Sequence, residues 1–154
     1  FIGVLLVAIQ GGLIRILIPK FGPRKNIIGG LLCYALGLFL IAFFSNHGWE
    51  VYLYMIPYCL GGVSGPALQG FISNQLGKDV QGELQGIFNS MSSLSIVIGP
   101  LLMSYVFRYF TAKGSLVYFP GAPYLLGAVL MLVSTALVVK DFRKRSAVKP
   151  ANAA

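Results

Sequence analysis

Acidic side chains are rare in this sequence. Only four of its 154 residues are Asp or Glu, one is His, and charged residues make up 10% of the chain, against roughly 25% in an ordinary soluble domain. Glu50, Asp79, Glu83, Asp141 and His47 all lie at the ends of apolar runs or between them. Intramembrane catalytic bases, metal sites and proton relays need such groups at membrane depth. We therefore expect no enzyme, no metal and no cofactor in this segment.

Cysteine is also scarce. Cys33 and Cys59 lie inside apolar runs, and their spacing matches no common zinc pattern. This predicts two small apolar side chains and no disulfide or metal site. No cleavable signal peptide is evident and the chain begins with Phe1, so we expect a native N-terminal segment to precede it.

Long apolar runs are what the sequence has in abundance. It is 56% hydrophobic with a mean hydropathy of +0.79, and about 20 apolar residues suffice to cross a bilayer. These runs predict an all-α polytopic transmembrane helix bundle of about five spans, followed by a basic, disordered tail at residues 140–154. The predicted spans are residues 1–18, 27–44, 51–72, 86–107 and 122–139.

The net charge of +8 would suggest a nucleic-acid partner in a soluble protein. Here most of the cations lie between the apolar runs or after the last one, where the positive-inside rule places them in cytoplasmic loops; Arg15 lies near the end of the first run. Only Arg108 and Lys113 fall on the opposite side. We therefore expect a lipid bilayer as the partner, no nucleic acid, and a cytoplasmic C-terminus.

Glycines and prolines predict how the spans pack and bend. Gly29, Cys33 and Gly37 are four residues apart and form a small-residue stripe on which another helix can pack closely. Two prolines inside the third span predict a bent helix, because each removes a backbone donor. Gly99-Pro100 predicts a break in the fourth span.

One side of the fourth span is polar. Gln85, Asn89, Ser92 and Ser93 recur at i, i+4, i+7 and i+8 and so share one side of a helix. These side chains either line a solute cavity or hydrogen-bond to neighbouring helices or to their own preceding turn and line nothing. The candidate substrate cavity comprises Gln10, Gln69, Gln85, Asn89, Ser92 and Ser93.

Four short motifs give the chain a family resemblance. The stretch RILIPKFGPRK at residues 15–25 resembles the second-half copy of the basic loop motif of major facilitator transporters, with Lys20, Gly22 and Arg24 at matching places and Lys25 adding charge. PALQG, QGELQG and IGPLL, at residues 66–70, 81–86 and 98–102, resemble stretches of the tetracycline-resistance branch of proton-coupled drug antiporters. The resemblance covers nearly the whole chain, from the eighth to the twelfth helix of that family.

The motifs also depart from the family pattern. Arg15 stands where the full loop motif has its first glycine, and Pro19 stands where it has an acidic residue. The charge relay of the first-half motif therefore does not carry over. Gly99 and Pro100 resemble the stretch that corresponds to the antiporter motif in the other repeat of the family fold. They do not resemble the antiporter motif itself.

The resemblance implies the C-terminal part of a transporter built from two six-helix halves, with the solute site between the halves and alternating access by rocking. It further implies efflux of a drug-like solute such as tetracycline from a bacterial inner membrane, driven by protons whose coupling residues lie in a preceding half. The basic loop and Gly99-Pro100 would be the elements that take part in the conformational change of such a transporter. A sugar or metabolite carrier, and a non-transporting scaffold or assembly subunit, remain alternatives.

Overall fold

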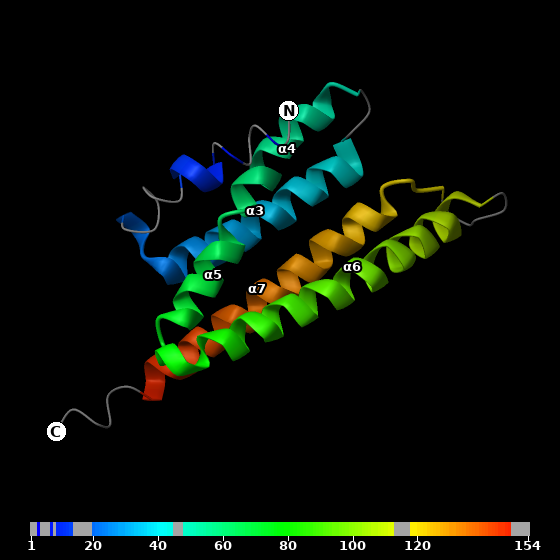
Figure 1. The fold of residues 1–154 in the computed structure, drawn as a ribbon. Coiled ribbons are helices and arrows are strands. Elements are labelled where there is room, and N and C mark those ends of the chain that lie inside the picture. The colour runs from blue at the N-terminus through cyan, green and yellow to red at the C-terminus, as the bar shows by residue number, and fades with distance from the viewer. Residues whose placement is uncertain are drawn as a thin grey trace.

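The computed structural model describes residues 3, 7, 9–13, 20–44, 48–112 and 118–148. Within these ranges all regular secondary structure is helical, which confirms the predicted all-α class (Figure 1). The elements are η1 (Ile9–Leu13), α3 (Pro23–Phe44), α4 (Glu50–Gly61), α5 (Ser64–Ser73), η2 (Lys78–Val80), α6 (Gln81–Thr111) and α7 (Ala122–Val148).

Three of these helices are long and apolar enough to cross a membrane, as judged by length and composition: α3, α6 and α7. They correspond to the second, fourth and fifth predicted spans. The first predicted span, residues 1–18, is described only at residues 3, 7 and 9–13. The third appears as two shorter helices, α4 and α5.

The break between α4 and α5 falls between the two prolines of the third predicted span. The backbone N–H groups of Gly62 and Val63 donate to carbonyls three residues back, at 3.0 and 3.3 Å, so the chain tightens for one turn. Pro57 lies inside α4 and Pro66 in the first turn of α5, where its missing N–H is least costly. This confirms the expected bend.

Glycines bring α3 close to α4 and α5. A Cβ added at Gly30 would lie 2.8 Å from Ser64 Cβ, and one added at Gly37 would lie 2.7 Å from the backbone nitrogen of Tyr58. Such distances are too short for real carbon atoms, so the two backbones approach as only glycine allows. Since Gly30 meets Ser64 and Gly37 meets Tyr58, the helices run antiparallel.

The predicted small-residue stripe is correct at Gly37 and wrong at Gly29. Among the described residues, nothing lies within 4 Å of a Cβ added at Gly29. The packing contact uses the adjacent Gly30 instead, because one residue rotates the helix surface by about 100°.

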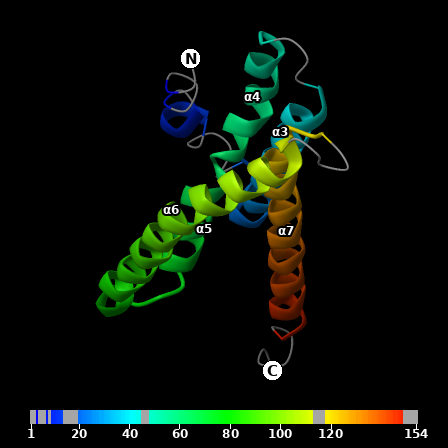
Figure 2. The same cartoon turned by 90° about the vertical axis from the view of Figure 1, so that its right-hand side faces the viewer.

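An adjacent side of α3 packs against α7, also antiparallel (Figures 1 and 2). In α7 the side chains of Ala128, Thr135 and Phe142 are buried and recur every seven residues, which places them on one side of the helix. At the other end of the contact, a Cβ at Gly121 would meet the backbone of Ala42. Thus α3 is the central helix of the packed unit.

Helix α6 stands apart from this unit. It meets α7 near the turn that joins them and then diverges from it (Figure 2), and none of its residues is buried within the described structure. The predicted break at Gly99-Pro100 is wrong, because α6 runs through both residues without interruption. A helix can lose the one hydrogen bond that Pro100 removes and still continue.

Helix α7 is longer than the sequence analysis expected. It continues through residue 148, so residues 140–148 are helical and differ from the predicted disordered tail. The physical reason is Phe142, which is buried at 8% exposure and packs with Ile27 and Ala67. Residues 149–154 lie outside the described residues.

The close contact of α3 with α4 can be tested with one methyl group. Gly37→Ala should destabilise the detergent-solubilised protein by about 1–3 kcal/mol, since the new Cβ would overlap the Tyr58 backbone. Thermal unfolding followed by intrinsic fluorescence measures the change. Gly29→Ala adds the same methyl to the same helix where space is open and should leave the melting temperature unchanged or raised; equal destabilisation by both variants would contradict the packing.

Candidate functional site

A chain of amide hydrogen bonds links α5 to α6. The Gln69 side-chain nitrogen Nε2 donates to Gln85 Oε1 at 2.6 Å, and Gln85 Nε2 donates to Asn89 Oδ1 at 3.5 Å. Gln85 and Asn89 are one helical turn apart on α6, whereas Gln69 comes from α5. The structure therefore brings together three of the six predicted cavity residues.

A groove of about 360 Å³ lies beside this chain of amides, between α5 and the first turns of α6. All the residues that line it are uncharged. Amide side chains both donate and accept hydrogen bonds. The groove can therefore orient a neutral polar group without a formal charge. Its lining residues are Pro66, Gln69, Gly70, Ser73, Gln81, Leu84 and Gln85.

The other predicted cavity residues lie elsewhere. Ser92 and Ser93 are exposed on α6, about one turn beyond Asn89. Ser95, on a different side, donates to the carbonyl of Met91 at 2.8 Å, as serines inside helices commonly do. The side chain of Gln10 lies outside the described residues.

The basic loop motif makes a tight turn into α3. Gly22 has a φ of +76°, a conformation that favours glycine, and Pro23 is the first residue of α3, where proline is well tolerated. Asn26 closes the turn, because both its backbone nitrogen and its side-chain Nδ2 donate to the Gly22 carbonyl, at 3.3 and 3.1 Å. Lys20 Nζ lies 5.9 Å from the centre of the Phe21 ring.

Arg24 of this motif lies over two aromatic rings from different helices. Its guanidinium carbon is 5.9 Å from the ring centre of Phe71 in α5 and 5.3 Å from that of Phe142 in α7. The two rings themselves meet edge to face at 5.4 Å. Cation–π and edge-to-face contacts each stabilise such an arrangement, so Arg24 joins the start of α3 to α5 and to α7. We call these three residues the arginine–aromatic cluster.

Sequence reasoning singled out Arg24 but missed both of its aromatic partners. Phe71 is one of many aromatic residues in apolar runs, and Phe142 falls in the segment that was expected to be a disordered tail. The available signal was Phe142 itself, a single phenylalanine among cations. A solvated tail gains no stability from an aromatic side chain, so a phenylalanine at this position indicates packing.

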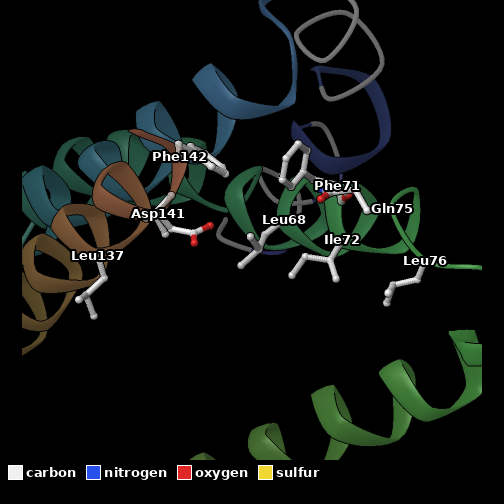
Figure 3. A pocket seen from close by; sticks show the side chains of 9 residues that line it. Leu68, Phe71, Ile72, Gln75, Leu76, Leu137, Asp141 and Phe142 are labelled. Atoms are coloured by element: carbon white, nitrogen blue, oxygen red, sulfur yellow. The ribbon is translucent and has the colours of Figure 1, made fainter. Parts of the chain in front are cut away.

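A second groove, of about 400 Å³, adjoins the cluster between α5 and α7. Most of its lining is apolar, and the Asp141 carboxylate points into the space between the two helices (Figure 3). Among the described residues no group of three or more His, Cys, Asp or Glu side chains is placed to hold a metal ion. The labelled lining residues in Figure 3 are Leu68, Phe71, Ile72, Gln75, Leu76, Leu137, Asp141 and Phe142.

Comparison with known proteins assigns the family. The sequence profile of the Major Facilitator Superfamily matches residues 1–153. The chain belongs to this superfamily, and with its apolar spanning helices it is an integral membrane protein. No solved structure matches the chain.

Curated relatives confirm the resemblance to the tetracycline-resistance branch. The chain is 35% identical over 114 residues to the class C tetracycline resistance protein of Escherichia coli, across 74% of this chain and 27% of that protein. It is 33% identical over 137 residues to the class H protein of Pasteurella multocida, across 88% of this chain and 33% of that protein. It is 32% identical over 143 residues to the class E protein of Escherichia coli, across 93% of this chain and 34% of that protein. The chain thus spans about a third or less of each relative's length.

The arginine–aromatic cluster predicts a measurable coupling energy. Arg24→Gln and Phe142→Leu should each lower the stability of the solubilised protein, and the double variant should lose about 0.5–2 kcal/mol less than the sum, because either change alone removes the cation–π contact. Thermal unfolding of the four proteins measures this coupling. Pairing Arg24→Gln with Phe43→Leu, whose ring packs on Phe39 and Phe119 instead, should give additive losses. Additivity in both cycles would show that Arg24 and Phe142 do not interact.

Proposed function

We propose that the protein is a transporter that exports a small amphipathic, drug-like solute such as tetracycline by alternating access, driven by proton entry. The observation that carries this proposal is α6, a helix of membrane-spanning length with no buried residue in the described structure and with the polar side of Gln85, Asn89, Ser92 and Ser93. Polar groups at membrane depth are costly unless protein or water satisfies them. A solute pathway meets that requirement.

The uncharged amides suit an amphipathic solute. The hydrogen-bonded Gln69, Gln85 and Asn89 can exchange their mutual bonds for bonds to carbonyl, hydroxyl or amide groups of the solute. Because the exchange replaces one exposed hydrogen bond by another, it requires little net free energy. Solute binding that is specific but weak allows the solute to be released on the other side of the membrane.

The conformational part of the proposal rests on the arginine–aromatic cluster. Arg24 connects the basic loop to the ends of α5 and α7, so Lys20, Gly22, Arg24 and Lys25 belong to an anchored end of the helix bundle. Movement of this end would carry α3, α5 and α7 together. Gly99 and Pro100 would allow α6 to bend during the same movement, since α6 lacks one backbone hydrogen bond there.

Proton coupling needs carboxylates near the middle of the spans, whereas the structure places Glu50, Asp79 and Glu83 at helix ends or in a short turn and Asp141 in the last third of α7. We therefore assign the coupling carboxylates to the remainder of the protein. The charge distribution supports a cytoplasmic C-terminus, because the basic loop and the cationic end of α7 lie at one end of the helix bundle, and the similarity to bacterial resistance proteins supports an inner-membrane location.

A sugar or metabolite carrier is the second candidate. The observation that favours it is the neutral, amide-lined groove, since Gln and Asn side chains also bind sugar hydroxyl groups. Transport of a labelled sugar in place of tetracycline would support this alternative.

The direct test uses everted membrane vesicles that contain the protein expressed from its complete gene. Vesicles energised with a proton gradient should accumulate tetracycline, and an uncoupler should abolish the uptake. Correctly inserted protein without gradient-dependent uptake would remove tetracycline as the substrate. Absence of transport for any tested solute would favour a non-transporting scaffold.

Asn89 provides a residue-level test of the cavity. Asn89→Ala should raise the KM for the transported solute about five- to tenfold with normal amounts of folded protein, because one hydrogen bond to a bound solute contributes about 1 kcal/mol. Ser95→Ala is the matched control on the same helix, since Ser95 bonds to its own backbone. If Asn89→Ala changed only the folded yield and left the KM unaltered, Asn89 would be a packing residue.

A further inference from the structure

Cationic side chains gather at one end of the helix bundle. Because α3 and α7 are antiparallel, α3 begins at the end where α7 finishes (Figure 1). Three cations belong to the basic loop and the first turn of α3, and three belong to the C-terminal part of α7; all are exposed. This cationic patch comprises Lys20, Arg24, Lys25, Lys140, Arg143 and Lys144.

The two halves of the patch are held together by a direct contact. The Arg24 guanidinium lies 5.3 Å from the centre of the Phe142 ring, and Phe142 is itself buried at 8% exposure. Phe142 sits between Asp141 and Arg143 in the sequence. The loop cations and the helix cations are therefore neighbours in space, and their mutual repulsion favours an anion beside them.

The cations of α7 point away from the protein interior. At about 100° per residue, Lys140, Arg143 and Lys144 occupy one side of the helix, opposite Phe142. Phe142 faces α3 and α5, so the three cations face the surroundings of the bundle. Asp141, the one acidic residue of α7, lies toward the groove between α5 and α7 instead (Figure 3).

The turns of α7 that precede these cations expose apolar side chains between the cationic side and the groove. Leu130, Val133 and Leu137 are 47%, 51% and 63% exposed and lead to Lys140 at helical spacing; Leu137 also lines the groove beside Asp141. An apolar stripe that ends in cations has the profile of one membrane leaflet, in which acyl chains give way to phosphate groups. Acyl chains can cover the apolar stripe and phosphate groups can pair with the cations, so neither part of this surface requires a protein partner.

We propose that the cationic patch binds the phosphate group of an anionic phospholipid, such as phosphatidylglycerol, whose acyl chains lie along Leu130, Val133 and Leu137. Lys140, Arg143 and Lys144 contact the headgroup from α7, while Lys20 and Lys25 extend the positive field from the loop. The arginine–aromatic cluster fixes the two sets of cations relative to each other. This site is independent of the solute and of the coupling ion.

The test measures lipid preference. The purified protein, expressed from its complete gene, is titrated in detergent with fluorescent phosphatidylglycerol and with fluorescent phosphatidylcholine. The unaltered protein should prefer phosphatidylglycerol, and Arg143→Gln with Lys144→Gln should weaken that binding about 30-fold, because each cation near a lipid phosphate contributes about fivefold. Raised salt should have the same effect by screening.

The control variant is Arg108→Gln with Lys113→Gln, which removes the same two residue types from the predicted opposite side; Lys113 lies outside the described residues. It should retain the preference for phosphatidylglycerol. Equal losses in both variants would overturn the site in favour of a general charge effect, and competition by millimolar inorganic phosphate would overturn it in favour of a soluble anion. Should the double variant fail to fold, as judged by gel filtration, Lys144→Gln alone should still weaken binding about fivefold, and unchanged binding would refute the proposal.

Discussion

The close approach of backbones at Gly30, Gly37 and Gly61 is the constraint on which the rest of the packing depends. In a membrane, apolar side chains gain little by leaving lipid, so helices associate through van der Waals contact and interhelical hydrogen bonds. Each of these glycines stands where a Cβ would overlap the neighbouring helix. At the break between α4 and α5, the Ser64 hydroxyl donates to the Gly61 carbonyl at 2.8 Å and satisfies a group that the interrupted helix leaves available. Contact and hydrogen bonding therefore reinforce each other at the same place.

With one side of α3 fixed in this way, the adjacent side determines where α7 can lie. Ile27 of α3, Ala67 of α5 and Phe142 of α7 form one buried cluster, and this cluster lies directly beneath Arg24. Burial of Phe142 explains why the helix persists into a strongly basic segment, since the packing of one ring offsets the repulsion between nearby cations. The basic loop motif consequently acts on two helices that are distant from it in the sequence.

The sequence was sufficient for the fold class and for the polar side of α6, because run length and helical periodicity are local properties. It could not predict whether Gly29 or Gly30 makes the helix contact, since the two glycines are adjacent and only the position of α4 selects between them. Nor could it pair Gln69 with Gln85, because that bond depends on how α5 and α6 meet across η2. Phe71 and Phe142 were missed for the same reason. The uninterrupted course of α6 through Pro100 was also missed, because a local rule for helix breaking was outweighed by the long helix on both sides of the proline.

The contrast between α6 and the packed unit bears on how a solute could pass. Helices α3, α4, α5 and α7 are joined by glycine contacts and by the buried cluster of Ile27, Ala67 and Phe142, which resist separation because many van der Waals contacts would be lost at once. Helix α6 is joined to α5 by an exposed hydrogen bond between the side chains of Gln69 and Gln85, which contributes only about 0.5–1.5 kcal/mol net. A helix held by such an exchangeable hydrogen bond can change its neighbours at little cost in free energy, whereas one held by glycine contacts cannot. Among the described helices, the polar side chains thus lie on the one that packs least against the others, which suits the alternating exposure of a solute site that we propose.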